Sequence, residues 1–151
     1  MITFHIEKWR PLYAELSVLL PKHWEEIAIT RDKVPLDVDV DKYAELCDQG
    51  ILHIVTARDD GKLIGYHVAM ICGHLHYKST LHGITDVYYL LPEYRGKMVG
   101  VRLFKEVEDD MRRRGVKKLY TGTKLHHDMG RMFERLGYKE TERLYTKFLE
   151  V

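Results

Sequence analysis

Residues 92–100 carry the residue types that bind an anion. Arg95 and Lys97 add positive charge, and Gly96 and Gly100 let a ligand approach the backbone closely. The segment lies between an expected strand and an expected long helix, whose start exposes amides without intrahelical partners. Together these features predict a phosphate or pyrophosphate site. An ordinary strand-to-helix turn with exposed basic residues explains the same local pattern equally well.

The elements that must position this turn follow from hydrophobic periodicity. Strands are expected over residues 2–6, 51–57, 63–72, 81–91 and 117–121, with a hairpin turn at Asp60-Gly61 between the second and the third. Helices are expected from Pro11 with a break at Pro21, around residues 43–49, over 100–114 with a stop at Gly115, and over 129–136. A loop is expected over residues 73–80, and residues 138–149 alternate weakly, as two further strands would. The order predicts an α/β fold with a mixed, twisted sheet of about six or seven strands flanked by about four helices.

The composition is that of one globular domain. The chain has 151 residues, with 24 Lys and Arg against 23 Asp and Glu, which argues against a dedicated nucleic-acid binder. Its two cysteines make no disulfide or metal framework. No apolar run reaches membrane-spanning length and the first residues lack a signal-peptide layout, so we expect a cytoplasmic chain without membrane contact.

Two segments carry a family resemblance. Residues 87–104 read Val-Tyr-Tyr-Leu-Leu-Pro-Glu-Tyr-Arg-Gly-Lys-Met-Val-Gly-Val-Arg-Leu-Phe, and residues 132–138 read Met-Phe-Glu-Arg-Leu-Gly-Tyr. In this order and spacing they resemble the two signatures of the GCN5-related N-acetyltransferase (GNAT) family. The resemblance implies an acetyl-CoA-dependent N-acetyltransferase without a metal, a compact GNAT-like domain over residues 1–151, and a CoA pyrophosphate held by the amides of the turn. It implies a CoA-binding set of Leu90, Leu91, Arg95, Gly96, Lys97, Met98, Val99, Gly100, Val101, His126 and Phe133.

Three residues depart from the family pattern. Met98 stands where the family has a glycine, and its side chain shifts the approach of CoA unless a negative φ directs it away. His126 occupies the place of an asparagine that contacts CoA. Phe133 replaces the tyrosine that often protonates the departing thiolate, although a thiol with a pKa of about 8.5 tolerates departure without an acid.

The resemblance further implies direct attack of an acceptor amine on the thioester. Strand alternation is expected to place Asp86, Tyr88 and Leu90 on one face, with His82 on the same face. Asp86 is then the leading general base, His82 the reserve, and the main-chain N–H of Leu90 the oxyanion donor. A structural carboxylate that pairs with a basic residue is the alternative reading of Asp86.

The acceptor is expected to meet residues 21–43 and Tyr88. Trp24 and Glu25 are the leading contacts in that segment, together with four further carboxylates at Glu26, Asp37, Asp39 and Asp41. These carboxylates favour a cationic amine, on either a small molecule or a protein. A solvated acidic surface explains the same residues at least as well.

Other readings have weaker support. A CoA-binding sensor or partner-binding module without turnover is the first alternative, because the general acid is missing. The run Arg112-Arg113-Arg114 suggests a nucleic-acid-associated protein, but Glu108, Asp109 and Asp110 precede these arginines by four residues and favour helical ion pairs. The pairs His74/His76 and His126/His127 lack the spacing of a closed zinc site. A homodimer is possible for this family, without a defined interface in the sequence.

Overall fold

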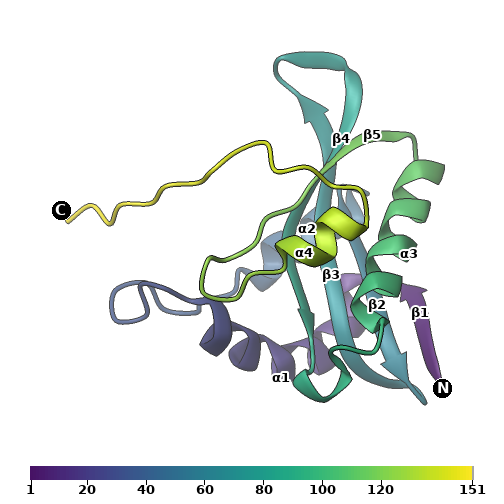
Figure 1. Ribbon diagram of the computed structural model, residues 1–151, viewed down its shortest axis with the longest axis vertical. Coiled ribbons are helices and arrows are strands. Elements are labelled where there is room, and N and C mark those ends of the chain that lie inside the picture. Colours follow the sequence, from purple (N-terminus) through teal and green to yellow (C-terminus); the bar gives the residue numbers. More distant parts are fainter. Residues whose placement is uncertain (151) are drawn as a thin grey trace.

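The computed structural model describes residues 1–150, whose five strands form one sheet in the order β1-β2-β3-β4-β5 (Figure 1). The strands are β1 (Ile2–Ile6), β2 (Leu52–Asp59), β3 (Lys62–His74), β4 (Tyr77–Leu90) and β5 (Val116–Tyr120). The helices are α1 (Trp9–Ile27), α2 (Val40–Asp48), α3 (Val99–Arg113) and α4 (Gly130–Arg135), and a 3-10 turn, η1, covers Pro92–Tyr94. The predicted α/β class and the mixed sheet are confirmed.

The pairing of the strands explains how the chain reaches the candidate site. Strands β1 to β4 are successive antiparallel neighbours, and β5 pairs with β4 in parallel. A parallel neighbour requires a crossover connection, which α3 supplies. The predicted turn between β2 and β3 is confirmed. Asp60 and Gly61 both have positive φ, 47° and 87°, as the two central residues of a type I′ hairpin turn require.

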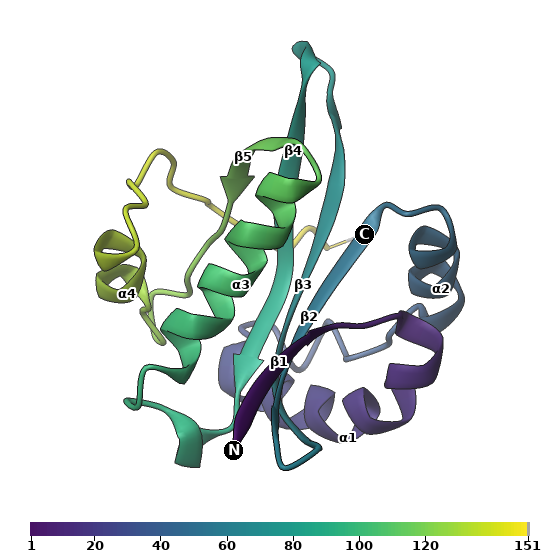
Figure 2. The ribbon, with the colours of Figure 1, turned by 90° about the vertical axis from the view of Figure 1, so that its right-hand side faces the viewer.

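Helices cover both faces of the sheet (Figure 2). Helix α3 lies on one face, and α1 and α2 lie on the other. Because the sheet is covered on both sides, β2 is buried at every residue from Leu52 to Ala57. Each long helix contributes apolar residues at helical spacing to the core. They are Trp9, Leu12, Leu16 and Leu19 on α1, and Leu103, Phe104, Val107 and Met111 on α3.

Three expectations about the elements are wrong. Within residues 1–150 the sheet has five strands rather than six or seven, because residues 138–150 contain no helix or strand and pair with no strand of the sheet. Helix α1 continues through Pro21, since Leu19 and His23 on either side of it are both buried in the layer beneath the sheet. The loop expected over residues 73–80 is a tight connection, because ladder pairing extends to His74 and Tyr77.

Candidate functional site

Strands β4 and β5 pair along only part of their length. The last paired residues are Ile84 and Tyr120, so residues 85–90 of β4 have no strand of the described chain on that edge. Tyr88 spans the gap, because its hydroxyl donates to the carbonyl oxygen of Gly122 at 2.7 Å. The two strands thus separate beyond the pair of Ile84 and Tyr120, which leaves main-chain groups of β4 open to a ligand.

Leu90 directs its amide toward this open edge. The amide of the next residue, Leu91, donates to the carbonyl oxygen of Ile64 on β3 at 2.8 Å. Adjacent amides of a strand point to opposite edges, so the Leu90 N–H points away from β3. The main-chain donor expected at Leu90 therefore has the required direction.

The turn after β4 gathers the residues expected to bind an anion at the start of α3 (Figure 1). Gly96 has a φ of 76°, in the left-handed region that favours glycine. The first intrahelical bond runs from the Arg102 amide to the Met98 carbonyl at 3.0 Å. Within residues 1–150, no side chain caps α3 and no acidic residue lies in its first turn. Three amides therefore lack a helical partner, those of Val99, Gly100 and Val101.

An anion fits this helix start. A Cβ added at Gly100 would meet the Sδ of Met132 at 3.4 Å, which is ordinary contact, so packing alone does not require glycine here. The missing side chain instead leaves space beside unpaired amides, and the exposed Lys97 adds charge. Met98 does not have the negative φ that would direct its side chain away from the approaching CoA. Its φ is 64°, a left-handed conformation that costs a non-glycine residue about 1–2 kcal/mol.

Arg95 anchors the turn rather than extending toward its amides. Its Nη2 lies 2.8 Å from both carboxylate oxygens of Glu26 on α1, and its Nε donates to the Leu90 carbonyl at 2.9 Å. The Nε2 of His126 forms a 2.8 Å hydrogen bond with the main-chain oxygen of the same Glu26. The imidazole of His127 lies 3.8 Å from the Glu26 carboxylate. Glu26, expected at the acceptor, thus joins α1, the turn and the segment before α4.

A bulge in β4 overturns the expected alternation. Val87 pairs with Val68 and Thr85 pairs with Ala69, so Asp86 is an extra residue with no partner on β3. The exposed Asp86 accepts a hydrogen bond from the Tyr43 hydroxyl on α2. Tyr88 instead packs under α3. Because α2 and α3 cover opposite faces of the sheet (Figure 2), Asp86 and Tyr88 point to opposite faces.

Tyr43 is a further candidate site residue, which the sequence did not indicate. It lies on the face of α2 that packs against the core. Its ring stacks on Trp9 with centroids 4.3 Å apart. Burial and the Asp86 charge both raise the pKa of Tyr43, so its hydroxyl stays protonated and donates to Asp86. No feature of the sequence pairs these two residues, which lie 43 positions apart.

His82 shares the α2 face with Asp86, as expected, since alternation is regular from His82 through Ile84 to Asp86. The side chain is buried and stacks on Tyr77 and Tyr120, with centroids 5.9 and 5.6 Å away. Neither ring nitrogen has a hydrogen-bond partner in the described chain. Desolvation lowers the pKa of His82, so a neutral ring able to accept a proton prevails near pH 7.

Phe133 and Tyr88 meet on the α3 face. Their ring centroids lie 5.8 Å apart, and both rings pack edge-on against Phe104 of α3. Tyr138 contacts Phe133 from the other side, with centroids 5.7 Å apart. The α4 signature therefore completes an aromatic cluster beneath α3. In this cluster Phe133 is buried and offers no hydroxyl.

The match to a family model decides what kind of protein this geometry belongs to. The model described as the acetyltransferase (GNAT) family covers residues 9–138, which is most of the chain. The chain belongs to the GNAT family. N-alpha-acetyltransferase 30 of Schizosaccharomyces pombe is 32% identical over 95 residues, which are 62% of this chain and 61% of that protein. This chain thus spans about three fifths of the length of that curated relative.

Solved structures share the GNAT fold at low sequence identity. The ribosomal-protein-alanine N-acetyltransferase from Brucella melitensis biovar Abortus 2308 has a TM-score of 0.74 and 18% identity, covering 99% of this chain and 100% of that one. A predicted acetyltransferase from Clostridium acetobutylicum, crystallised with acetyl-CoA, has a TM-score of 0.71 and 13% identity, covering 100% and 96%. At these identities the likeness shows the fold alone. The resemblance to the GNAT family is confirmed.

The residues expected at the acceptor of this GNAT chain lie in separate places. Glu25 pairs with Arg31 at 3.0 Å, and the Arg31 guanidinium lies 5.6 Å from the Trp24 ring centre. Asp39 caps α2 by accepting from a main-chain amide at 3.0 Å. Asp39 and Asp86 line one pocket of about 140 Å³ on the α2 face, with Tyr43, Met70 and three other residues. Trp24, Glu25 and Tyr88 lie outside this pocket.

The arginine run at the end of α3 is engaged within the chain. Arg112 pairs with Asp109 at 2.7 Å, and Arg113 pairs with Asp110 at 3.1 Å. Each arginine pairs with the acidic residue three positions before it, whereas a spacing of four was expected. Both spacings place the two side chains on the same face of the helix. Arg114 donates to a main-chain carbonyl at the end of α2 at 2.9 Å.

The histidine pairs form local contacts. The amide of His76 donates to the Nδ1 of His74 at 3.1 Å, and His126 and His127 both contact Glu26. Residues 1–150 contain no group of three or more His, Cys, Asp or Glu placed to hold a metal ion. None of their helices has the length and apolar character needed to cross a membrane.

Proposed function

We propose that this GNAT chain is an acetyl-CoA-dependent N-acetyltransferase that acetylates a primary amine by direct attack in a ternary complex. The observation that carries the proposal is the uncapped start of α3 beside the open edge of β4. Unpaired amides suit a pyrophosphate, and free strand groups suit an extended amide-containing arm. The N-acetyltransferase names of the relatives and the relative crystallised with acetyl-CoA support the same reaction.

The pyrophosphate would be held by the amides of Val99, Gly100 and Val101, with Lys97 adding charge. When bound, acetyl-CoA supplies an acetyl group activated as a thioester. Arg95 contributes indirectly, because its bonds to Glu26 and Leu90 fix the turn in the conformation that presents these amides. The Leu90 N–H offers a donor for the acetyl oxygen on the open edge.

Asp86 is the proposed general base. Its Oδ2 accepts from the Tyr43 hydroxyl, which orients the carboxylate. The acceptor's ammonium gives a proton to Asp86, and the resulting amine nitrogen attacks the acetyl carbon of the thioester. The carbon–sulfur bond then breaks, CoA leaves as its thiolate, and the nitrogen releases a second proton to give the neutral amide. His82, neutral and on the same face, is the reserve base. We assign no general acid, since Phe133 has no hydroxyl and a thiol ionises near pH 8.5.

The α2 face favours a cationic acceptor. The pocket beside Asp86 also contains Asp39, Tyr43 and Lys42, whose ammonium group pairs with Glu45 at 3.1 Å. The rest of its lining is apolar and consists of Leu46, Leu52 and Met70. Two carboxylates attract an ammonium group, and the apolar wall suits an aliphatic or peptide chain attached to it. The expected substrate class is therefore a primary amine on an otherwise partly apolar molecule.

A thiol-release assay with acetyl-CoA and a panel of amines tests the proposal. The panel contains polyamines, aminoglycosides and peptides with free N-termini. We expect turnover with at least one cationic amine, lost in Asp86→Asn and retained in the control Asp109→Asn, at an exposed carboxylate on α3. Acetyl-CoA binding without turnover across the panel would favour the CoA-binding sensor. A folded protein that does not bind acetyl-CoA would contradict both.

A further inference from the structure

Two walls enclose the open edge of β4. One wall is β4 itself beyond Ile84, and the other is the segment of residues 121–127 between β5 and α4, called the second wall below. The walls meet where Ile84 pairs with Tyr120. Figure 1 shows the second wall running from β5 toward the end of α1 before the chain turns back to α4. The two walls diverge from the pair at β5, and the proposed path of the acetyl-CoA arm lies between them.

Glu26, in the last turn of α1, contacts both walls. Toward β4, its carboxylate lies 2.8 Å from the Nη2 of Arg95, whose Nε donates to the Leu90 carbonyl at 2.9 Å. Toward the second wall, its main-chain oxygen accepts from the Nε2 of His126 at 2.8 Å, and its carboxylate lies 3.8 Å from the His127 imidazole. These contacts of Glu26, called the α1 bridge below, join the two walls through one residue of α1.

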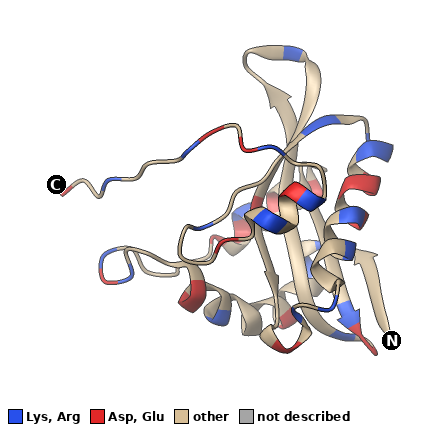
Figure 3. Cartoon of the chain, viewed as in Figure 1, with Lys and Arg blue, Asp and Glu red and all other residues tan. Residues whose placement is uncertain are grey.

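The two sides of the α1 bridge differ in strength. Figure 3 shows acidic residues at the end of α1, where the second wall approaches it. The Glu26 and Arg95 side chains are only 25% and 31% exposed, so water screens this ion pair less than a pair at the open surface. His126 is exposed, and its single hydrogen bond is the only direct bond from the bridge to the second wall within residues 1–150. The second wall therefore depends on a bond that a substitution can remove without disturbing the ion pair.

A further contact holds the second wall on the opposite face of the sheet. The Tyr88 hydroxyl donates to the carbonyl oxygen of Gly122 at 2.7 Å, and the Tyr88 ring packs under α3. The His126 bond lies further along the second wall and reaches α1, which covers the other face of the sheet (Figure 2). The second wall is thus held from both faces.

An extended arm beside β4 needs a defined space. Neighbouring strands lie about 4.8 Å apart, so an arm that bonds to β4 on one side and to the second wall on the other requires these walls to stay roughly 10 Å apart. A wall that could move freely would close on β4 or leave the arm bonded on one side only. Contacts that fix the wall before the arm arrives lower the ordering cost of binding.

We propose that the α1 bridge holds the second wall at the spacing that the acetyl-CoA arm needs, and that His126 is a positioning residue that acts through this wall rather than as a contact of CoA. The inference rests on the proposed function, because it requires acetyl-CoA to bind along β4. The His126 bond would serve the arm alone, since the proposed pyrophosphate site consists of amides at the start of α3 that this bond does not contact.

Variants of His126 test the α1 bridge by calorimetry. His126→Leu removes the donor to Glu26, whereas His126→Gln keeps an N–H at a similar reach. The acetyl-CoA Kd should rise about 3–10-fold in His126→Leu, as loss of one hydrogen bond permits, and change by less than about twofold in His126→Gln. ADP has the pyrophosphate of CoA without its arm, so its affinity, measured by competition, should be the same in both variants and the unaltered protein. The kcat at saturating acetyl-CoA should also stay unchanged.

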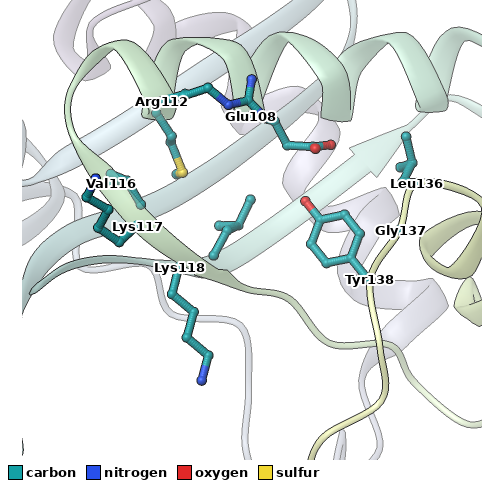
Figure 4. A pocket seen from close by; sticks show the side chains of 10 residues that line it. Glu108, Arg112, Val116, Lys117, Lys118, Leu136, Gly137 and Tyr138 are labelled. Atoms are coloured by element: carbon teal, nitrogen blue, oxygen red, sulfur yellow. The ribbon is translucent and has the colours of Figure 1, made fainter.

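Glu26→Gln tests the other side of the α1 bridge. Because Arg95 also fixes the turn, loss of the Glu26 charge should weaken both acetyl-CoA and ADP, unlike His126→Leu. The matched control is Glu108→Gln, at another partly buried carboxylate. Glu108 lines a pocket of about 240 Å³ between α3, β5 and residues 136–138, whose lining includes no residue of the bridge. Figure 4 shows the Tyr138 hydroxyl directed toward Glu108 in this pocket. Both affinities should be unchanged in this control.

Hydrogen exchange of the unliganded protein separates positioning from direct contact with CoA. The amide of His127 donates to the Lys124 carbonyl at 3.1 Å, and the amide of Met129 donates to the Thr123 hydroxyl at 2.7 Å. If His126 positions the second wall, His126→Leu should speed exchange of these two amides before any CoA is present. A residue that only contacts CoA would leave their exchange unchanged.

The outcomes distinguish this inference from the proposed function. An unaltered protein that binds neither acetyl-CoA nor ADP contradicts the proposed function, and the inference with it. If acetyl-CoA binds but His126→Leu keeps full affinity, only the α1 bridge is overturned. Weaker acetyl-CoA binding with unchanged hydrogen exchange, or an equal loss in His126→Gln, overturns the bridge in the same way.

Discussion

The two faces of β4 are built from different groups. On the α3 face, Tyr88 packs in an aromatic cluster with Phe104 and Phe133. On the α2 face, Asp86 is exposed and accepts a hydrogen bond from Tyr43, while neither ring nitrogen of His82 has a hydrogen-bond partner within residues 1–150. One extra residue in the strand produces the contrast. In a regular strand Asp86 and Tyr88 would lie on the same face, but the bulge at Asp86 places them on opposite faces.

The contrast separates two tasks in the proposed reaction. The open edge of β4 and the start of α3 would bind acetyl-CoA, whereas the proton-transfer groups lie on the α2 face. A substitution at the turn should therefore change acetyl-CoA affinity. A substitution on the α2 face should change kcat and leave that affinity intact.

Asp86→Asn is expected to have the largest effect. It removes the proposed base while keeping the size of the side chain, so kcat should fall by about 10²–10³-fold. The Kd for acetyl-CoA, measured by calorimetry, should change by less than about twofold. A kcat within about threefold of the unaltered enzyme, or a lost acetyl-CoA affinity, would show that the two faces do not divide the tasks in this way.

Acid should destabilise both faces together, because each carries a buried neutral histidine. Burial lowers the pKa of His23 to about 4 and that of His67 to about 3, and their hydrogen-bond partners are Tyr66 and Thr85. Below pH 6.5 the unfolded chain binds protons that the folded chain does not. The unfolding free energy should therefore fall as the pH drops from 6.5 toward 4, by up to about 1.4 kcal/mol per pH unit for each histidine.

Urea titrations at pH 7, 5.5 and 4.5 measure this slope. In His67→Gln the unfolding free energy should depend less steeply on pH, because the contribution of His67 is lost. In the separate variant His23→Gln the contribution of His23 should be lost in the same way. An unfolding free energy that does not change across this range would contradict the buried neutral state of these rings.

Tyr43→Phe should produce a smaller change on the α2 face alone. Loss of the hydroxyl removes the donor that orients Asp86, and we expect kcat to fall about 3–10-fold because water replaces part of that bond. The control is Tyr13→Phe, whose ring also packs on Trp9 and whose hydroxyl has no partner in the described chain. Equal losses in both variants, or a changed acetyl-CoA Kd, would point to a purely structural role for Tyr43.

Met98→Gly should have the smallest effect, on stability rather than on rate. It relieves a left-handed conformation that costs about 1–2 kcal/mol, partly offset by the greater freedom of glycine in the unfolded chain. We expect a gain of about 0.5–1 kcal/mol in urea unfolding. Lys97→Gly, next to it at negative φ, should lose stability instead. A destabilised Met98→Gly would indicate that the Met98 side chain makes a contact the turn depends on.

Signals that lie close together in the sequence predicted much of the fold. The Asp60-Gly61 turn, the apolar spacing of α3 and the stop at Gly115 each depend on neighbouring residues, and all three agree with the structure. Two ordered signatures were enough to indicate the family. The turn proposed to bind the pyrophosphate could be singled out for the same reason, because a helix start and its glycines are contiguous.

What the sequence could not show depends on distant partners. The bulge at Asp86 arises from the register between β3 and β4, and no local pattern reveals it. Arg95 looked like a ligand for phosphate, yet Glu26, 69 residues away, holds it. The weak alternation of residues 138–149 resembled two strands, but these residues pair with no strand of the sheet, and alternation alone does not supply a pairing partner.

The most direct test of the central claim is a calorimetric titration of the folded protein with acetyl-CoA. We expect micromolar-range binding that is lost in Gly100→Glu, because a carboxylate would occupy the space beside the unpaired amides of α3. Binding should persist in Gly73→Glu, where a Cβ meets nothing within 4 Å, and in Asp86→Asn. Absence of binding by the unaltered protein, or full binding by Gly100→Glu, would contradict a pyrophosphate site at the start of α3.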